Sequence, residues 1–242
     1  MRVALVTGAA GGIGSATVSR LVRDGCAVVA LDVRDEVSAL AGDHVLPVVG
    51  DVRLPADLAG AVAVAVDGLG RLDTVVAAAA VIAGGRPLWE TPPDQLDELL
   101  SVDTVGVWNT AAAAIPAMLA GPDPSGCRFV AVASAAGHQG MYGLAAYTIA
   151  KHGVVGLVKG LAADLAGTGV TACAVSPGST RTPMLDATAS LYGLPDAGDF
   201  ASHQLLHRLL EPEEVAAAIA FCCSRDGAVV NGSVVHADGG FS

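Results

Sequence analysis

Short apolar segments rich in β-branched residues alternate with longer Ala- and Leu-rich segments along most of the chain. The short segments are typical of strands in a parallel sheet, which are apolar throughout because both faces are covered. The long segments place apolar residues three and four positions apart, as helices with one buried face do. The predicted strands are 3–7, 26–32, 45–51, 72–80, 127–134, 170–176 and 233–238, and the predicted helices are 12–24, 55–70, 101–120, 145–167 and 212–224.

This alternation predicts an α/β fold in which a parallel sheet carries helices on both faces. A chain of 242 residues can form one large core, so we expect a single domain over residues 1–242. The segment 184–208 breaks the rhythm with glycine, proline and several polar residues. Long ordered segments of this kind often contact ligands, so it is either a substrate loop or lid, or a purely structural loop.

Composition and charge narrow the possible surroundings and partners. Although 52% of the residues are hydrophobic, no apolar run reaches the roughly eighteen residues of a membrane span, and the first residues do not resemble a signal peptide. The five cysteines form no CxxC pair, which fits reduced thiols in the cytoplasm and predicts no metal site. The formal charge of -11 repels nucleic acids. We therefore expect a cytoplasmic protein with a small-molecule substrate and no nucleic-acid or membrane partner.

A glycine-rich turn follows the first predicted strand directly and opens the first predicted helix. Gly8, Gly12 and Gly14 form a GxxxGxG pattern, with Ile13 inside it. Glycine lets the backbone approach a pyrophosphate, and the helix N-terminus offers free N–H groups and a partial positive charge. Glycines alone are weak evidence, but their position between strand and helix predicts a dinucleotide site.

Acidic residues at the ends of the next two strands complete this prediction. Asp32 ends the second strand, where a carboxylate can accept hydrogen bonds from the adenosine ribose hydroxyls. Asp32 would also repel a 2′-phosphate, so the sequence favours NAD over NADP, although Arg34 lies two residues further on. Asp51 and Val52 close the third strand, where they could hold the adenine ring through a carboxylate and a backbone N–H.

Tyr147 and Lys151 stand four residues apart in a predicted helix, and Ser134 lies thirteen residues before the tyrosine. Residues four apart share a helix face, so the ammonium lies beside the phenol. A free phenol titrates near pH ~10, and a neighbouring cation lowers that value. The three residues therefore form a candidate proton-transfer site.

These motifs, in this order from end to end of the chain, resemble the short-chain dehydrogenase/reductase family. The resemblance implies a doubly wound Rossmann-type domain with a seven-stranded parallel sheet, usually as a tetramer or dimer, and hydride transfer between NAD(P) and an alcohol or carbonyl. It implies that Tyr147 transfers the proton, that Lys151 lowers the pKa of the phenol and binds the nicotinamide ribose, and that Ser134 binds the substrate oxygen. Further cofactor contacts implied by the family pattern fall on Ile13, Ala78, Pro177, Gly178, Thr180 and Thr182.

Two positions depart from the family pattern. Ala77 to Ala80 replace an asparagine-containing turn after the fourth strand, which leaves apolar packing to brace the sheet and only backbone groups to contact the cofactor. Asp103 replaces an asparagine that helps to hold a water in the proton relay to the lysine. The relay could continue through the main-chain carbonyl of Asp103, the carboxylate could pair with Lys151 and tune it, or the substitution could be inert.

Longer strings such as AAAAVIAGGRPLWET and HQLLHRLLEPEEV resemble a narrower actinobacterial subfamily associated with the redox peptide cofactor mycofactocin. That resemblance implies an alcohol dehydrogenase that keeps NAD tightly bound and passes electrons to the peptide cofactor. Two alternatives stay open: a reductase of 3-oxoacyl-(acyl carrier protein), and a catalytically idle NAD-binding sensor or scaffold.

Large apolar residues near the site predict a mid-sized, mostly apolar alcohol or ketone as substrate. The predicted wall consists of Trp89, Met141, Tyr142, Met184, Leu185, Leu191 and Tyr192. The helices 101–120 and 145–167 carry small apolar residues around their whole circumference, more than one buried face requires. With the family resemblance, this predicts a homotetramer.

Overall fold

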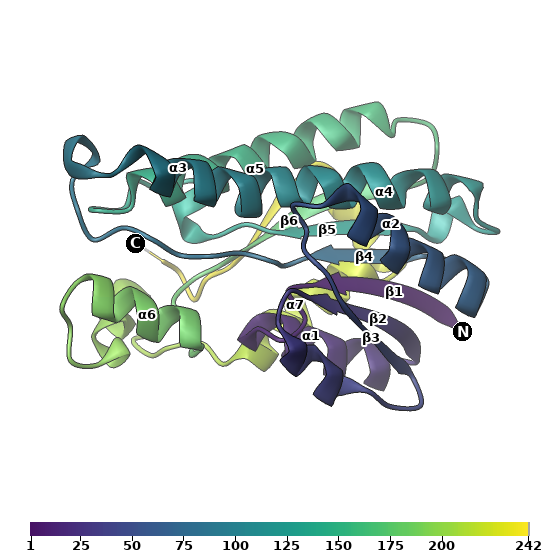
Figure 1. Cartoon of the computed structure of the whole chain (residues 1–242), viewed down its shortest axis with the longest axis horizontal. Helices are drawn as coiled ribbons and strands as arrows, with labels where there is room; N and C mark the ends of the chain where they lie inside the picture. Colours follow the sequence, from purple (N-terminus) through teal and green to yellow (C-terminus); the bar gives the residue numbers. More distant parts are fainter. Residues whose placement is uncertain (242) are drawn as a thin grey trace.

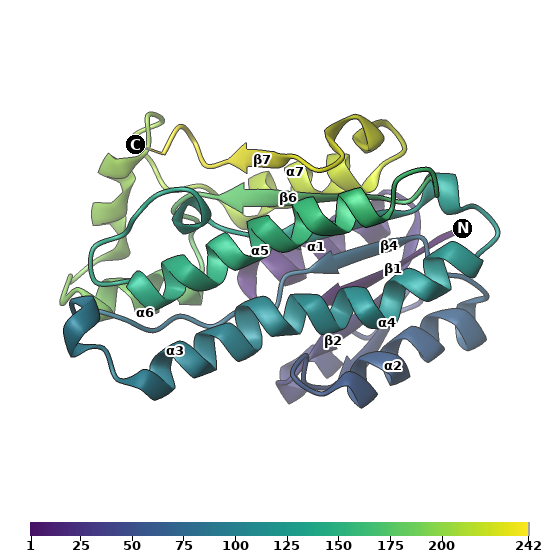
Figure 2. The same ribbon diagram turned by 90° about the horizontal axis from the view of Figure 1, so that it is seen from above.

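Seven parallel strands form the centre of the molecule in the computed structural model, which describes residues 1–241. Their order in the sheet is β3-β2-β1-β4-β5-β6-β7, as Figures 1 and 2 show from two sides. The predicted α/β class with a seven-stranded, Rossmann-type parallel sheet is confirmed. The strands are β1 (Arg2–Thr7), β2 (Cys26–Asp32), β3 (Val45–Val49), β4 (Thr74–Ala77), β5 (Arg128–Val132), β6 (Thr171–Pro177) and β7 (Val234–Ala237).

Helices cover both faces of this sheet (Figure 1). One face packs against α2 (Pro55–Ala63), α4 (Gly106–Ala120) and α5 (Ala145–Asp164), and the other against α1 (Gly12–Arg23) and α7 (Pro212–Cys223). Each face has its own apolar core, because side chains on successive residues of a strand point to opposite sides. Both faces of the central strands are therefore buried, which explains their unbroken apolar character.

The predicted helix 101–120 begins earlier than expected. The chain is helical from α3 (Pro93–Leu99) through a π-helical turn (Leu100–Val105) into α4. Pro93 in the first turn, followed by Asp94, is a helix-start signal that accounts for the earlier beginning. The π-helical turn, a distortion that often marks functional sites, contains Asp103.

The segment 184–208 also contains more regular structure than the sequence suggested. It comprises most of α6 (Pro183–Leu191) and a 3₁₀ segment (Ala197–His203). The Thr182 hydroxyl caps α6 by accepting the N–H of Leu185 at 3.3 Å, and Pro183 occupies the first helical turn, two signals of a helix start. In Figure 2, α6 lies at the end of the molecule toward which the arrows of β6 and β7 point.

Among the described residues, no helix is both long and apolar enough to cross a membrane.

The sheet changes its direction of winding between β1 and β4. These strands are neighbours in the sheet, yet the chain leaves β1 for α1 on one face and leaves β4 for α3 and α4 on the other (Figure 1). Because the two connections diverge, a crevice opens at the carboxyl ends of these strands. This crevice is where the sequence places the dinucleotide.

The sheet interior generates a stability prediction. Phe129 on β5 is completely buried in the core beneath α4 and α5, so Phe129→Ala should lower the free energy of unfolding by about 3–5 kcal/mol. Urea denaturation measures this change. Phe221→Ala is the matched control, since Phe221 on α7 is 46% exposed, and a loss of similar size in both variants would contradict the assignment of the core.

Candidate active site

The glycine turn after β1 brings the backbone against the neighbouring connection. Gly8 has a φ of +67°, and a side chain there would collide with the backbone of Ala78 and Ala79. A side chain at Gly14 would collide with the carbonyl of Gly8. Only glycine fits either position, and the turn delivers the N-terminus of α1 to the crevice without side chains in between.

Asp32 lies at the end of β2 and is 5% exposed. One carboxylate oxygen accepts the N–H of Ala10 at 2.9 Å, and the other accepts the backbone N–H of Arg34 at 3.0 Å and its Nε at 3.2 Å. These bonds fix the carboxylate at the rim of the cleft, where the sequence predicts the ribose site. The Arg34 side chain remains 49% exposed.

Asp51 and Val52 also reach this end of the cleft. The Asp51 carboxylate is engaged by Arg53, whose Nε and Nη2 lie 2.8 and 2.5 Å from Oδ2. Hydrogen bonds from this guanidinium hold the pKa of Asp51 below its ordinary value. Arg53 lines the cleft as well. Sequence reasoning missed it, because an arginine in a loop is usually solvated and no motif marks this one.

Polar acceptors hold the Ala77 to Ala80 turn, which corrects the expectation that apolar packing alone replaces the missing asparagines. The Thr7 hydroxyl at the end of β1 accepts the N–H groups of Ala78 and Ala79 at 3.2 and 3.3 Å. Asp103 accepts the N–H of Val81 at 2.8 Å. Packing contributes too, since Ala78 and Ala79 contact the two cores. The role of Thr7 had no sequence signal, because it depends on the neighbouring strand.

Ser134, Tyr147 and Lys151 meet at the carboxyl end of β5. Ser134 follows this strand, whereas Tyr147 and Lys151 lie on successive turns of α5, and all three line the same cleft. Lys151 Nζ is 5.6 Å from the centre of the Tyr147 ring. Tyr147 and Lys151 therefore share one face of α5, and the Ser134 hydroxyl approaches the phenol from the segment after β5.

Lys151 is almost completely buried, with 2% of its surface exposed. Its Nζ donates to the carbonyl of Val132 at 3.3 Å and lies 3.3 Å from Oδ2 of Asp103. Burial works to lower the pKa of Lys151, but Asp103 and Tyr147 outweigh burial and leave it above its ordinary value. Asp103 and Tyr147 therefore favour the charged form of the lysine.

The Tyr147 phenol differs from expectation in the net direction of its pKa. Burial raises this pKa above its ordinary value; Lys151 acts against the increase, Asp103 adds to it, and the Ser134 hydroxyl lowers it slightly. The expected influence of the lysine is present, but burial exceeds it. The protein surroundings of Tyr147 therefore favour the protonated phenol.

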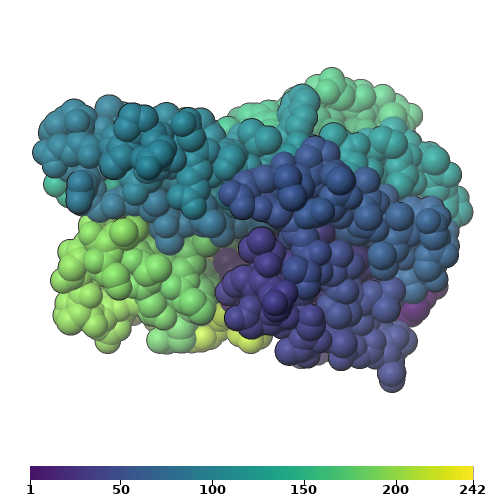
Figure 3. Space-filling model, viewed as in Figure 1, coloured from purple at the N-terminus to yellow at the C-terminus, as the bar shows by residue number. Residues whose placement is uncertain are grey.

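The cleft that contains these residues has a volume of about 1120 Å³ and opens as the hollow beside the green α6 segment in Figure 3. It is large for a site that takes one small molecule. Asp103 does not line it and instead lies behind Lys151 with no exposed surface. All the other predicted site residues line it: Gly8, Gly12, Ile13, Gly14, Asp32, Asp51, Val52, Ala78, Ser134, Tyr147, Lys151, Pro177, Gly178, Thr180 and Thr182.

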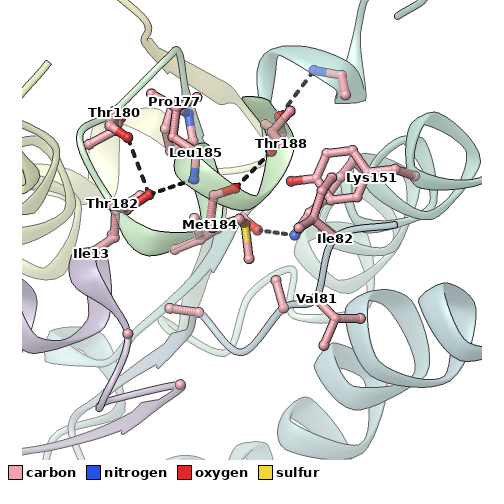
Figure 4. Close-up of a pocket in the computed structure, with 18 of the residues that line it drawn as sticks. Ile13, Val81, Ile82, Lys151, Pro177, Thr180, Thr182, Met184, Leu185 and Thr188 are labelled. Atoms are coloured by element: carbon pink, nitrogen blue, oxygen red, sulfur yellow. Dashed lines mark hydrogen bonds between the residues drawn. The ribbon is translucent and has the colours of Figure 1, made fainter. Parts of the chain in front are cut away.

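Apolar side chains also line the cleft, and several of them are labelled in Figure 4. Val81 and Ile82 come from the segment after β4, and Met184 and Leu185 come from α6. Of the predicted wall, five members line the cleft: Met141, Tyr142, Met184, Leu185 and Tyr192.

Two residues of the predicted wall lie elsewhere. Trp89 is 82% exposed and does not reach the cleft. Leu191 packs against a small apolar cluster that includes Leu144 and Tyr147. Val81 and Ile82 are two lining residues that sequence reasoning missed. They belong to the VIAGG string after the alanines, where position along the chain gives no indication of which side chains face inward.

The sequence predicts no metal site, and within residues 1–241 one group of potential ligands comes together. Ligand atoms of His138, His236 and Asp238 lie within 4.8 Å of one another, outside the cleft. Each imidazole has a protein partner: His138 Nδ1 lies 3.4 Å from the Ser176 hydroxyl, and His236 Nδ1 lies 3.5 Å from Asp238.

Known proteins resemble this chain over nearly its full length. A sequence model of the family described as enoyl-(acyl carrier protein) reductase matches residues 8–242. An A-factor type gamma-butyrolactone 1′-reductase (1S-forming) of Streptomyces virginiae is 35% identical, with 100% of this chain and 95% of that protein covered. An uncharacterised NAD-dependent oxidoreductase of Mycobacterium tuberculosis is 31% identical, covering 99% of this chain and 95% of the relative.

Solved structures agree with these relatives. Levodione reductase superposes with a TM-score of 0.91 at 30% identity, covering 98% of this chain and 96% of that one. The 3-ketoacyl-(acyl-carrier-protein) reductase of Brucella melitensis, solved in complex with NADH, gives a TM-score of 0.88 at 29% identity, with coverages of 99% and 97%. With the serine, tyrosine and lysine assembled beside the glycine turn, these matches establish that the chain belongs to the short-chain dehydrogenase/reductase family of oxidoreductases.

Proposed function

We propose that the protein is an NAD-dependent oxidoreductase that transfers hydride between the nicotinamide and an alcohol or ketone. The observation that carries this proposal is one cleft lined at one end by the glycine turn and Asp32, and at the other by Ser134, Tyr147 and Lys151. A dinucleotide bound along it would bring its redox end to the proton-transfer residues. The apolar wall of Val81, Ile82 and α6 favours a substrate with little charge.

The residues present fit a dinucleotide. Gly8 and Gly14 leave backbone groups open where side chains would collide, and the N-terminus of α1 points N–H groups at this space, as anionic phosphates require. Asp32 offers a fixed carboxylate for ribose hydroxyls. The Mycobacterium tuberculosis relative is named as NAD-dependent, and the Brucella melitensis neighbour was solved with NADH; both support NAD over NADP.

The mechanism follows from the positions of the three polar side chains. Bound NAD supplies the hydride acceptor for alcohol oxidation and, once reduced, the hydride donor for ketone reduction. Tyr147 takes the hydroxyl proton of the alcohol during oxidation and returns it during reduction, general acid–base help worth about 10² to 10⁴ in rate. Ser134 donates a hydrogen bond to the substrate oxygen, and Lys151 stabilises the phenolate through its charge.

The finer proposal is that this is a mycofactocin-coupled alcohol dehydrogenase with tightly held NAD. It rests on the sequence strings after β4 and before α7, and one structural feature supports it. Thr182, the cap of α6, lies against Gly12 at the start of α1, so the start of α6 lies beside the glycine turn. A cofactor held between these two segments would exchange slowly.

Two alternatives remain distinguishable. A 3-oxoacyl-(acyl carrier protein) reductase is favoured by the Brucella melitensis neighbour, but the net charge of -11 would repel an acidic carrier protein. An idle NAD-binding sensor is disfavoured, because the three residues that would transfer the proton are assembled.

The predicted location and assembly remain part of the proposal. All five cysteines are free and buried, which supports reduced thiols in the cytoplasm. On the outer sides of the π-helical turn, α4 and α5, the large apolar residues Val105, Trp108 and Ile149 are exposed by 47%, 65% and 47%. Exposed apolar residues on neighbouring helices support a subunit interface, which the predicted homotetramer requires.

Tyr147→Phe tests the catalytic assignment. Without its hydroxyl the ring cannot take a proton, so alcohol turnover should fall by a factor of about 10² to 10⁴, while the dissociation constant of NAD changes little. Steady-state kinetics and calorimetric titration with NAD measure the two quantities. A variant that retains more than a tenth of the activity would show that another group transfers the proton.

Asp32→Asn tests cofactor choice. The amide keeps the shape and an acceptor oxygen but loses the charge that repels a 2′-phosphate, so the preference for NAD over NADP should fall at least about tenfold. Asp35→Asn is the control, since Asp35 is exposed nearby. Dissociation constants for both cofactors decide the outcome, and an unchanged preference in Asp32→Asn would remove Asp32 from the ribose site.

Cofactor exchange tests the mycofactocin proposal. The purified protein should release NAD on denaturation, and before denaturation this NAD should not exchange with isotopically labelled NAD over hours. Mass spectrometry measures both. Rapid exchange would count against the finer proposal but leave the NAD-dependent oxidoreductase intact, whereas retained NADP would contradict both.

A further inference from the structure

The carboxylate of Asp103 joins two parts of the site from behind. Its Oδ1 accepts the N–H of Val81, the first residue after the alanine turn, at 2.8 Å. Its Oδ2 lies 3.3 Å from Lys151 Nζ and has no well-directed hydrogen-bond partner. One oxygen therefore braces the backbone, and the other faces the ammonium as a charge.

Burial makes this contact electrostatically important. Asp103 has no exposed surface and Lys151 has 2%, so water screens neither group. An isolated charge in such surroundings is strongly disfavoured, and a partner of opposite sign offsets part of that cost. Burial leaves the pKa of Asp103 above its ordinary value, although Lys151 and the Val81 N–H oppose the increase and favour the carboxylate.

Resting on the proposed function, we infer that Asp103 is a positioning residue: its carboxylate is the buried counter-ion of Lys151, and it cancels part of the field that the ammonium exerts on the Tyr147 phenol. The carboxylate therefore adds a charge effect that the asparagine of the family pattern could not supply. It holds the lysine charged and at the same time makes ionisation of the tyrosine harder. The net charge of the pair next to the phenol is close to zero instead of +1.

The other groups around the pair do not offer the same effect. Tyr147 lies on α5 with Lys151, and Ser134 comes from the segment after β5. Glu98 on α3 is the further charged group that acts on Asp103, and it is exposed to solvent. Solvent screens an exposed charge far more than a buried one. Among these neighbours, Asp103 is the buried negative charge.

Asp103→Asn isolates the charge from the shape. An asparagine keeps a carbonyl oxygen that can accept the Val81 N–H, but it removes the negative charge beside Lys151. The ammonium then acts on the phenol without a counter-ion, so Tyr147 should ionise at a pH lower by roughly one unit, given that one charge at close range moves a pKa by one or more units.

Tyrosinate absorbance gives a readout that needs no turnover. The difference in absorbance between a protein and its Tyr147→Phe derivative, followed against pH, reports Tyr147 among the three tyrosines. The midpoint in the Asp103→Asn background should lie roughly one pH unit below that of the unmodified protein. Asp164→Asn is the matched control, because it removes the same charge from an exposed position on α5, the helix that carries Tyr147, and should leave the midpoint in place.

The pH profile of alcohol oxidation should move in the same direction. The phenolate is the active form, so kcat/KM rises as pH rises through the ionisation of Tyr147, and a lower pKa moves this rising limb to lower pH. A shift in the absorbance titration without turnover in any protein would contradict the proposed function and leave the counter-ion role intact. Turnover with unshifted midpoints would overturn the counter-ion role alone.

Stability provides a second test if Asp103→Asn folds poorly. Lys151→Met leaves the buried carboxylate without its partner and should lower the melting temperature. Adding Asp103→Asn to Lys151→Met should then restore part of the loss, because the unpaired charge disappears. A double variant no more stable than Lys151→Met at neutral pH would show that Asp103 is not an ionised partner of Lys151.

Discussion

The junction between β1 and β4 is the constraint on which the rest of the site depends. The two strands lie side by side in the sheet, but their connections leave toward opposite faces, so a crevice must form between them. The Thr7 hydroxyl ties the ends together by accepting the N–H groups of Ala78 and Ala79. Gly8 fits against the same backbone without a side chain. The floor of the cleft is thereby fixed before any ligand arrives.

The buried contact between α5 and the π-helical turn extends this floor to the proton-transfer residues. Asp103 is bonded to the segment after β4 and faces Lys151 on α5. The same carboxylate thus connects the alanine turn, the helix that carries the tyrosine, and the charge that the tyrosine experiences. A buried ion pair of this kind often adds little stability compared with apolar packing. Its value here lies in geometry and in the control of protonation.

The family relationship defines the type of reaction, but it does not define the substrate. Relatives of similar fold carry names as different as A-factor type gamma-butyrolactone 1′-reductase and levodione reductase, which agrees with the general rule that one fold serves many substrates. In this protein the part of the cleft away from the glycine turn is formed by Val81, Ile82 and the side chains of α6. Because α6 is held at its start by Thr182, the shape of this wall depends on local capping as well as on the sheet.

Local patterns in the sequence determined the strands, the glycine turn and the shared face of Tyr147 and Lys151, because each depends on residues close together in the chain. Pro93 and Pro183 are weaker local signals, one in the first turn of α3 and one in the first turn of α6. The apolar residues that follow them are irregularly spaced, so the sequence shows no clear helical period there. The tertiary structure alone decided which residues line the cleft, that Thr7 braces the alanine turn, and that Asp103 meets Lys151. Asp103 and Lys151 come from separate helical segments that the fold packs together. The environment of a buried charge is set by such packing, and no pattern of neighbouring residues encodes it.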